Sequence, residues 1–121
     1  MTPFGVRVRQ LRAQKGIQLK EMAVALHVSS AYLSALEHGK RGRPGPGLVM
    51  QIADYFGLIW DQVDELKELA QLSHPRVPIE TGGLSPNATL LANRLAVHIH
   101  ELDENTLTRM LAEMGFNGED G

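Results

Sequence analysis

The residues best suited to chemistry in this sequence are its cations, and they gather in one part of the chain. Residues 1–43 hold eight Lys and Arg and two Glu, a formal charge of +6, whereas residues 44–121 hold four Lys and Arg and twelve acids, a formal charge of -8. The net charge of -2 conceals this division. A polyanion is attracted to the first segment and repelled by the second, so electrostatics alone predicts the orientation of such a partner.

No pattern for catalysis or metal binding accompanies these cations. The chain has no Cys, and its His residues fall on different expected elements. The closest pair is two residues apart on one helix and faces different ways, so the three or four converging ligands of a zinc site are not available. No Ser stands in a nucleophile elbow and no acid pair is positioned by a motif for proton transfer. We expect no enzyme activity, no metal and no cofactor. The histidines are His27, His38, His74, His98 and His100.

Length and composition limit the class of protein further. A chain of 121 residues fits one domain, or a compact domain of about 70 residues with a smaller helical appendage. The absence of Cys suits a reducing compartment. The sequence contains neither an apolar run approaching the roughly 20 residues of a membrane span nor the apolar core of a secretory signal. We expect a cytoplasmic protein with no membrane partner.

Caps and apolar spacing predict five helices in residues 1–73, which we expect to form one domain. Thr2 and Pro3 are typical of a helix start, and Gly16 and Gly39 of helix ends. Two short helices, with the small Ala23 where their backbones must approach, favour a helix-turn-helix arrangement. The expected helices span residues 3–15, 19–26, 30–38, 46–56 and 60–73.

The sequence also predicts a loop in this domain and the inward face of its fifth helix. The stretch KRGRPGPG contains too much Gly and Pro to be helical and is expected to be an exposed loop. Helical spacing predicts which side chains of the fifth helix face inward. These are Trp60, Val63, Leu66 and either Leu69 or Ala70.

The remainder of the chain is expected to be a linker, two amphipathic helices and a tail. The linker is residues 74–86, which are rich in Pro and Gly. Residues 87–116 form the helices, and residues 117–121 a disordered tail. Two amphipathic helices beyond a complete domain must bury their apolar faces, which self-association achieves economically. The predicted dimerisation residues are Leu91, Leu95, Ile99, Leu102, Leu107, Met110, Leu111 and Met114.

A resemblance to a known family covers roughly residues 4–72. The matches in register are Ala23 and the motifs VSSAYLS, LEHGK and IADYFGL. These motifs resemble the phage-repressor and Cro/C1 type of helix-turn-helix domain, also called the Xre family. The resemblance implies a five-helix, all-helical domain that binds double-stranded DNA as a dimer, with residues 30–38 as the recognition helix in the major groove.

The resemblance also implies that Arg12 pairs with Glu37 and holds the recognition helix at its angle. The alternative is that Glu37 is an exposed surface acid.

The resemblance implies a set of DNA contacts with modest base readout. Leu19 replaces a family Gln that reaches phosphate, while Ser30 and Ala35 occupy positions where the family often presents Arg, Lys or Gln. No bidentate contact from Arg to guanine is available from this helix. Tyr32 is equally well explained as a half-buried packing residue. The expected contacts are Gln18, Lys20, Ser29, Ser30, Ala31, Tyr32, Ser34, His38, Lys40, Arg41 and Arg43.

The motif RGRP, residues 41–44, also resembles the core of an AT-hook. In an AT-hook an extended Arg-Gly-Arg lies in the narrow minor groove of A·T-rich DNA, where the negative potential is enhanced. The alternative is that Lys40, Arg41 and Arg43 contact only phosphates.

These observations favour a repressor-like transcription regulator and leave two alternatives open. In one, the C-terminal helices bind a toxin or other partner protein, and the chain is an antitoxin that regulates its own operon. In the other, the chain is a protein-interaction module without DNA binding. Only DNA binding predicts a salt-dependent affinity for duplex DNA, because phosphate neutralisation releases counterions.

Overall fold

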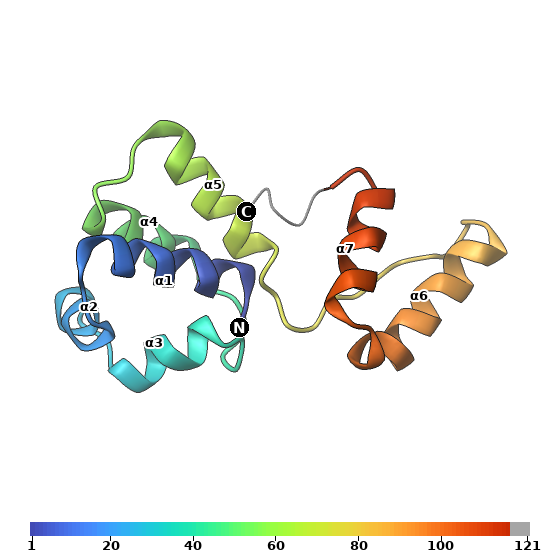
Figure 1. Ribbon diagram of the computed structural model, residues 1–121, viewed down its shortest axis with the longest axis horizontal. Helices are drawn as coiled ribbons and strands as arrows, with labels where there is room; N and C mark the ends of the chain where they lie inside the picture. Colours follow the sequence, from blue (N-terminus) through green and yellow to red (C-terminus); the bar gives the residue numbers. More distant parts are fainter. Residues whose placement is uncertain (117–121) are drawn as a thin grey trace. The chain divides into compact units, whose positions relative to one another are not determined.

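A computed structural model of the chain describes residues 1–116, which divide into a unit of residues Met1–Arg76 and a second unit that begins at Val77 (Figure 1). These residues form seven α-helices and one short 3-10 helix, with no strand among them. The all-helical fold class expected from the sequence is confirmed. The predicted tail, residues 117–121, lies outside the described residues. Within residues 1–116 none of the helices has the length and apolar character needed to cross a membrane.

Five helices make up the first unit, and their starts follow the caps in the sequence. The Thr2 hydroxyl accepts a hydrogen bond from the Gly5 N–H at 3.0 Å, and Gly16 ends the first helix with φ at 64°. The Ser29 hydroxyl caps the third helix by accepting from the Tyr32 N–H at 3.0 Å. The helices are α1 (Pro3–Lys15), α2 (Leu19–Leu26), α3 (Ser30–Glu37), α4 (Pro46–Tyr55) and α5 (Trp60–Gln71).

The turn between α2 and α3 is short and well defined. His27 ends α2 in the left-handed region with φ at 59°, and the Val28 N–H donates to the Ala23 carbonyl at 3.0 Å. The small Ala23 is buried. The two helices therefore pack against each other through a helix-turn-helix, as Figure 1 shows.

One hydrophobic core joins the five helices. Met22 is fully buried, and Phe4, Val8, Ile52 and Leu66 are each 1% exposed. The whole cluster comes from all five helices and the segment after α4, and it comprises Phe4, Val8, Leu11, Met22, Ala23, Leu26, Leu33, Leu36, Val49, Ile52, Ala53, Phe56, Leu66 and Ala70.

A close approach of two backbones fixes the start of α1 against the end of α3. A Cβ added at Gly5 would lie 2.2 Å from the Glu37 carbonyl oxygen, so only glycine fits there. The Thr2 N–H donates to that same oxygen at 3.0 Å. The buried Ser73 accepts from the Phe4 N–H at 2.9 Å and thereby connects the segment after α5 to the same end of α1.

The expectation that Trp60 faces the core is wrong. Its side chain is 83% exposed, whereas Leu66 and Ala70 are buried. At about 100° per residue, Leu66 lies about 120° around the helix axis from Trp60, so the two cannot share one narrow apolar face. Trp60 is also the first residue of α5 and has a positive φ of 40°, which separates it further from the regular pattern.

The second unit contains α6 (Pro86–His98), a 3-10 helix η1 (Ile99–Glu101) and α7 (Glu104–Glu113). The first of the two helices expected in residues 87–116 ends at His98, whose Nδ1 lies 2.5 Å from a Glu101 carboxylate oxygen, and η1 follows it directly. Asp103 caps α7 by accepting from the Thr106 N–H at 2.7 Å. None of the side chains of α6, η1 and α7 is buried.

Candidate nucleic-acid interface

An ion pair between α1 and the end of α3 holds the third helix in place. Both terminal carboxylate oxygens of Glu37 accept from Nη2 of Arg12, at 3.1 and 3.0 Å. The Glu37 side chain is 5% exposed and that of Arg12 12% exposed. This is the pair that the resemblance implies, and the alternative of an exposed Glu37 does not match its burial. Paired charges this far from water fix the relative position of the elements that carry them.

The outer face of α3 offers small polar groups and a half-buried ring. Ser30 and Ala31 are exposed, Ser34 and Tyr32 are partly buried, and Leu33 faces the core. The Ser29 hydroxyl accepts the Tyr32 N–H, so its own hydrogen remains available to a further acceptor. The surface can therefore offer hydroxyl groups and a methyl group to a ligand, but no side chain with a charge.

The basic loop, residues 40–43, follows α3 directly and has a folded conformation. Gly39 and Gly42 have φ values of 77° and 76°, and Lys40 and Gly42 form an isolated β-bridge. The Lys40 N–H donates to the Ala35 carbonyl at 2.8 Å. This tight turn differs from the extended Arg-Gly-Arg of an AT-hook, so the resemblance of RGRP to that motif does not extend to its conformation here.

One contact of the basic loop, and the burial of the residue that follows it, were not predicted from the sequence. The Arg41 guanidinium lies 5.9 Å from the centre of the Tyr32 ring, close enough for a cation–π interaction, while Pro44 is buried and anchors the end of the loop. The spacing of nine residues between Tyr32 and Arg41 gives no sequence signal, because the contact depends on the turn at Gly39. Tyr32 is thus half-buried against the core, and its ring also contacts a cation of the basic loop.

Positive charge on this surface has almost no acidic neighbour in the sequence. From Met22 to Ala53 the only acidic residue is Glu37, which is buried in its pair with Arg12. Lys40, Arg41 and Arg43 are exposed and form no ion pair with any residue of the described part of the chain. This uncompensated positive charge attracts an anionic partner.

Three other residues expected to bind DNA lie at the start of α2 and at the end of α3. Gln18 and Lys20 are exposed at the start of α2, where the Gln18 N–H donates to a Glu21 carboxylate oxygen at 3.3 Å. His38 is exposed, and its Nδ1 lies 2.8 Å from the Ser34 carbonyl oxygen, so the ring folds back along the last turn of α3.

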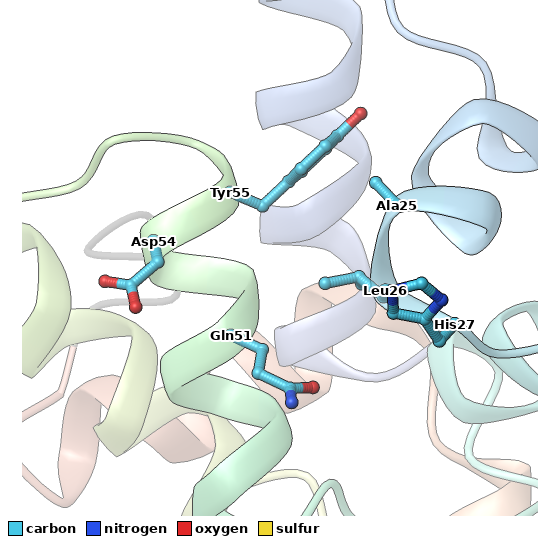
Figure 2. Close-up of a pocket in the computed structure, with 6 residues that line it drawn as sticks. All are labelled: Ala25, Leu26, His27, Gln51, Asp54 and Tyr55. Carbon is cyan, nitrogen blue, oxygen red and sulfur yellow. The ribbon is translucent and has the colours of Figure 1, made fainter.

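A hollow of about 360 Å³ lies between α2 and α4 (Figure 2). It is lined by polar side chains that include His27, Gln51 and Asp54, but in Figure 2 the Asp54 carboxylate and the Tyr55 hydroxyl point in different directions from the His27 ring. Among residues 1–116 no three His, Asp or Glu side chains gather where they could hold a metal ion.

The predicted dimerisation residues leave apolar surface on the second unit. Leu91, Ile99 and Met114 are 55%, 52% and 71% exposed. Leu111 is also exposed, whereas four are partly covered: Leu95, Leu102, Leu107 and Met110. Further apolar side chains of this unit are exposed as well, namely Val77, Ile79, Leu84, Leu90, Val97 and Phe116.

Residues 3–69, more than half of the chain, match the family described as the helix-turn-helix domain. The chain belongs to this family, and the matched residues run from the start of α1 into α5.

Three curated bacterial proteins are similar to the chain. The HTH-type transcriptional repressor RghR of Bacillus subtilis (strain 168) is 30% identical over 86 residues, which cover 67% of this chain and 61% of the relative. The uncharacterized HTH-type transcriptional regulator RghRB of the same strain is 40% identical over 53 residues, 44% of this chain and 38% of the relative. The HTH-type transcriptional regulator DdrOP3 of Deinococcus deserti is 41% identical over 54 residues, 43% of this chain and 40% of the relative.

The chain thus spans between 38% and 61% of the length of these curated relatives. No solved structure matches it.

Proposed function

We propose that the chain is a double-stranded DNA-binding transcription regulator of the repressor-like kind, with α3 as its recognition helix. One observation carries the proposal: the outer face of α3 and the basic loop form a continuous segment whose only acid, Glu37, is buried in an ion pair. Such a surface suits the phosphate backbone of DNA. The family match and the names of the three relatives support the same function.

In this proposal α3 enters the major groove and the basic loop lies along the sugar-phosphate backbone. Base contacts from Ser30, Ala31 and Ser34 are hydroxyl hydrogen bonds and methyl contacts, so direct readout is modest. Much of the affinity then comes from phosphate contacts by Lys20, Lys40 and further members of the predicted set, which are Gln18, Ser29, His38, Arg41 and Arg43.

The basic loop can also reach an A·T-rich minor groove if the turn at Gly42 opens. Arg43→Ala is then expected to weaken binding to an A·T-rich duplex more than to a G·C-rich duplex, because the narrow A·T groove has the stronger negative potential. Fluorescence anisotropy with both duplexes measures the difference. An equal loss on the two duplexes would identify Arg43 as a phosphate contact.

A homodimer built by α6 and α7 is the second part of the proposal. These helices bury none of their side chains within the described unit, so their apolar side chains are available for contact with another chain. A second copy supplies an identical face, and the dimer would position two recognition helices about one turn of DNA apart. Light scattering at working concentration is expected to give the mass of a dimer, and a monomer would contradict this part.

The same exposed helices favour one competing function, an antitoxin-type regulator whose second unit binds another protein. Co-purification of a second small protein with the chain from its native host would support this function. A regulator of either kind acts where bacterial DNA lies, so we propose a cytoplasmic location.

Selection of bound sequences from a pool of random duplexes tests the proposal as a whole. We expect recovery of A·T-rich sites with two symmetric half-sites, as a dimer with modest base readout requires. Recovery of single half-sites would contradict the dimer. No enrichment together with no retention on duplex DNA would leave only the protein-interaction module that lacks DNA binding.

A further inference from the structure

A second hollow of the first unit opens between the basic loop, α4 and α5. Its volume is about 610 Å³, within the roughly 300–1,000 Å³ of small-molecule sites. Neither the sequence motifs nor the proposed function assigns a role to it. It is lined by Arg43, Pro44, Gly45, Pro46, Val49, Met50, Lys67, Ala70 and Gln71.

The lining combines an apolar floor with two cations. Val49 and Ala70 are buried and Met50 is 39% exposed, so part of the wall belongs to the hydrophobic core. Arg43 and Lys67 supply positive charge from the loop and from α5, and neither pairs with an acid among residues 1–116. No carboxylate lines the hollow, although α5 carries four acidic residues. An anion is therefore the complementary charge.

The loop that forms one wall is held in a restricted conformation. Pro44 is buried, and its ring restricts the preceding Arg43 to extended backbone conformations. Pro46 begins α4 directly after Gly45. The two prolines thus limit the backbone conformations of this wall before any ligand arrives, which lowers the entropic cost of binding.

We propose that this hollow binds a small organic anion, a carboxylate or phosphate ester with an apolar body. The apolar body would lie against Val49 and Met50, and the anionic group would bind Lys67 and Arg43. Arg43 also belongs to the proposed DNA surface, so the ligand withdraws a cation from DNA and lowers the affinity for it. This consequence rests on the proposed function, whereas the ligand site itself does not.

A titration of the full chain with phenyl phosphate, followed by amide chemical shifts in NMR, tests the site. Shifts are expected at Gly45, Met50, Lys67 and Gln71, with saturation below about 1 mM. Lys67→Gln should weaken binding about fivefold or more, because it removes one of two cations, whereas Lys15→Gln, an exposed lysine outside the hollow, should change it less than about twofold. Benzyl alcohol and inorganic phosphate should each bind more weakly, because each lacks one half of the recognised chemistry.

The outcomes separate the site from the proposed function. Shifts confined to residues outside the hollow, or equal binding of benzyl alcohol, would overturn the anion site. Phenyl phosphate should also lower the affinity of the wild-type chain for duplex DNA, with a smaller effect on Lys67→Gln. If Lys67→Gln alone weakens DNA binding by more than about twofold, Lys67 contacts DNA and the hollow belongs to that surface, which overturns the proposal. Saturable binding in a chain with no affinity for DNA would support the site and contradict the proposed function.

Discussion

Replacing Arg12 by Met tests how the recognition helix is held. The change leaves the Glu37 carboxylate, whose side chain is 5% exposed, without its cation. Breaking a buried pair in this way costs about 3–5 kcal/mol of the free energy of unfolding. Because the Arg12 side chain is 12% exposed and water can reach its edge, we expect the lower end, about 3 kcal/mol. The melting temperature should fall by about 12 °C or more.

A matched control and a double variant make this prediction specific. Arg7 also pairs with an acid of the first unit, but its Nε lies 3.7 Å from a Glu65 carboxylate oxygen and the two side chains are 21% and 41% exposed. Arg7→Met should therefore cost less than about 1 kcal/mol. The double variant Arg12→Met, Glu37→Met removes both buried charges and should recover most of the stability that Arg12→Met loses.

Urea and thermal unfolding followed by far-UV circular dichroism measure these free energies. A loss of stability in Arg12→Met as small as that in Arg7→Met would contradict a buried ion pair at Arg12. Additive effects of Arg12→Met and Glu37→Met in the double variant would contradict it as well, since residues in a real pair are coupled.

Three further predictions follow from single positions. Gly5→Ala should destabilise the first unit by about 2 kcal/mol or more in the same unfolding assay, because its Cβ would meet the Glu37 carbonyl at 2.2 Å; wild-type stability would refute that contact. Trp60→Ala should change the free energy of unfolding by less than about 0.5 kcal/mol, since the ring is 83% exposed, and a loss of several kcal/mol would contradict its exposure. Hydrogen bonds from the backbone N–H and then the side chain of Thr106 lower the pKa of Asp103. The stabilisation of α7 by this cap should therefore be complete when the pH is above the ordinary carboxyl pKa, and it should be lost as the pH falls through the lowered pKa. Amide exchange in α7 should show this loss in the wild type and not in Asp103→Ala.

The sequence predicts the helices of the first unit well because their boundaries are local. Thr2 and Ser29 carry a cap oxygen, Pro3 and Pro46 begin helices, and Gly16 permits the left-handed conformation that ends one. Such signals depend on neighbours within one turn, and sequence reasoning reads them directly.

The sequence predictions fail where apolar spacing does not determine whether a side chain is buried or which residue it contacts. Trp60 has apolar character and a plausible spacing, but its position at the first residue of α5 with a positive φ turns it to solvent. His98, where α6 ends, contacts Glu101 in the next turn, and the contact between Tyr32 and Arg41 depends on the turn at Gly39. Propensity does not determine contacts of this kind.

The candidate site could be predicted in part. Its cations are visible as a division of charge along the sequence, and the partner of Glu37 was implied by a resemblance. The hollow that contains Lys67 could not be predicted, because it forms only when α5 packs beside the loop and α4.

The salt dependence of binding to a random-sequence duplex tests the central claim most directly. We expect the full chain to bind at low ionic strength, with the logarithm of the affinity falling linearly as the logarithm of the salt concentration rises. The triple variant Lys40→Gln, Arg41→Gln, Arg43→Gln should reduce that slope by up to about 3 per bound chain, whereas Arg94→Gln with Arg109→Gln in the second unit should leave it unchanged. No affinity for any duplex at low salt, or the same slope in the triple variant, would contradict the account.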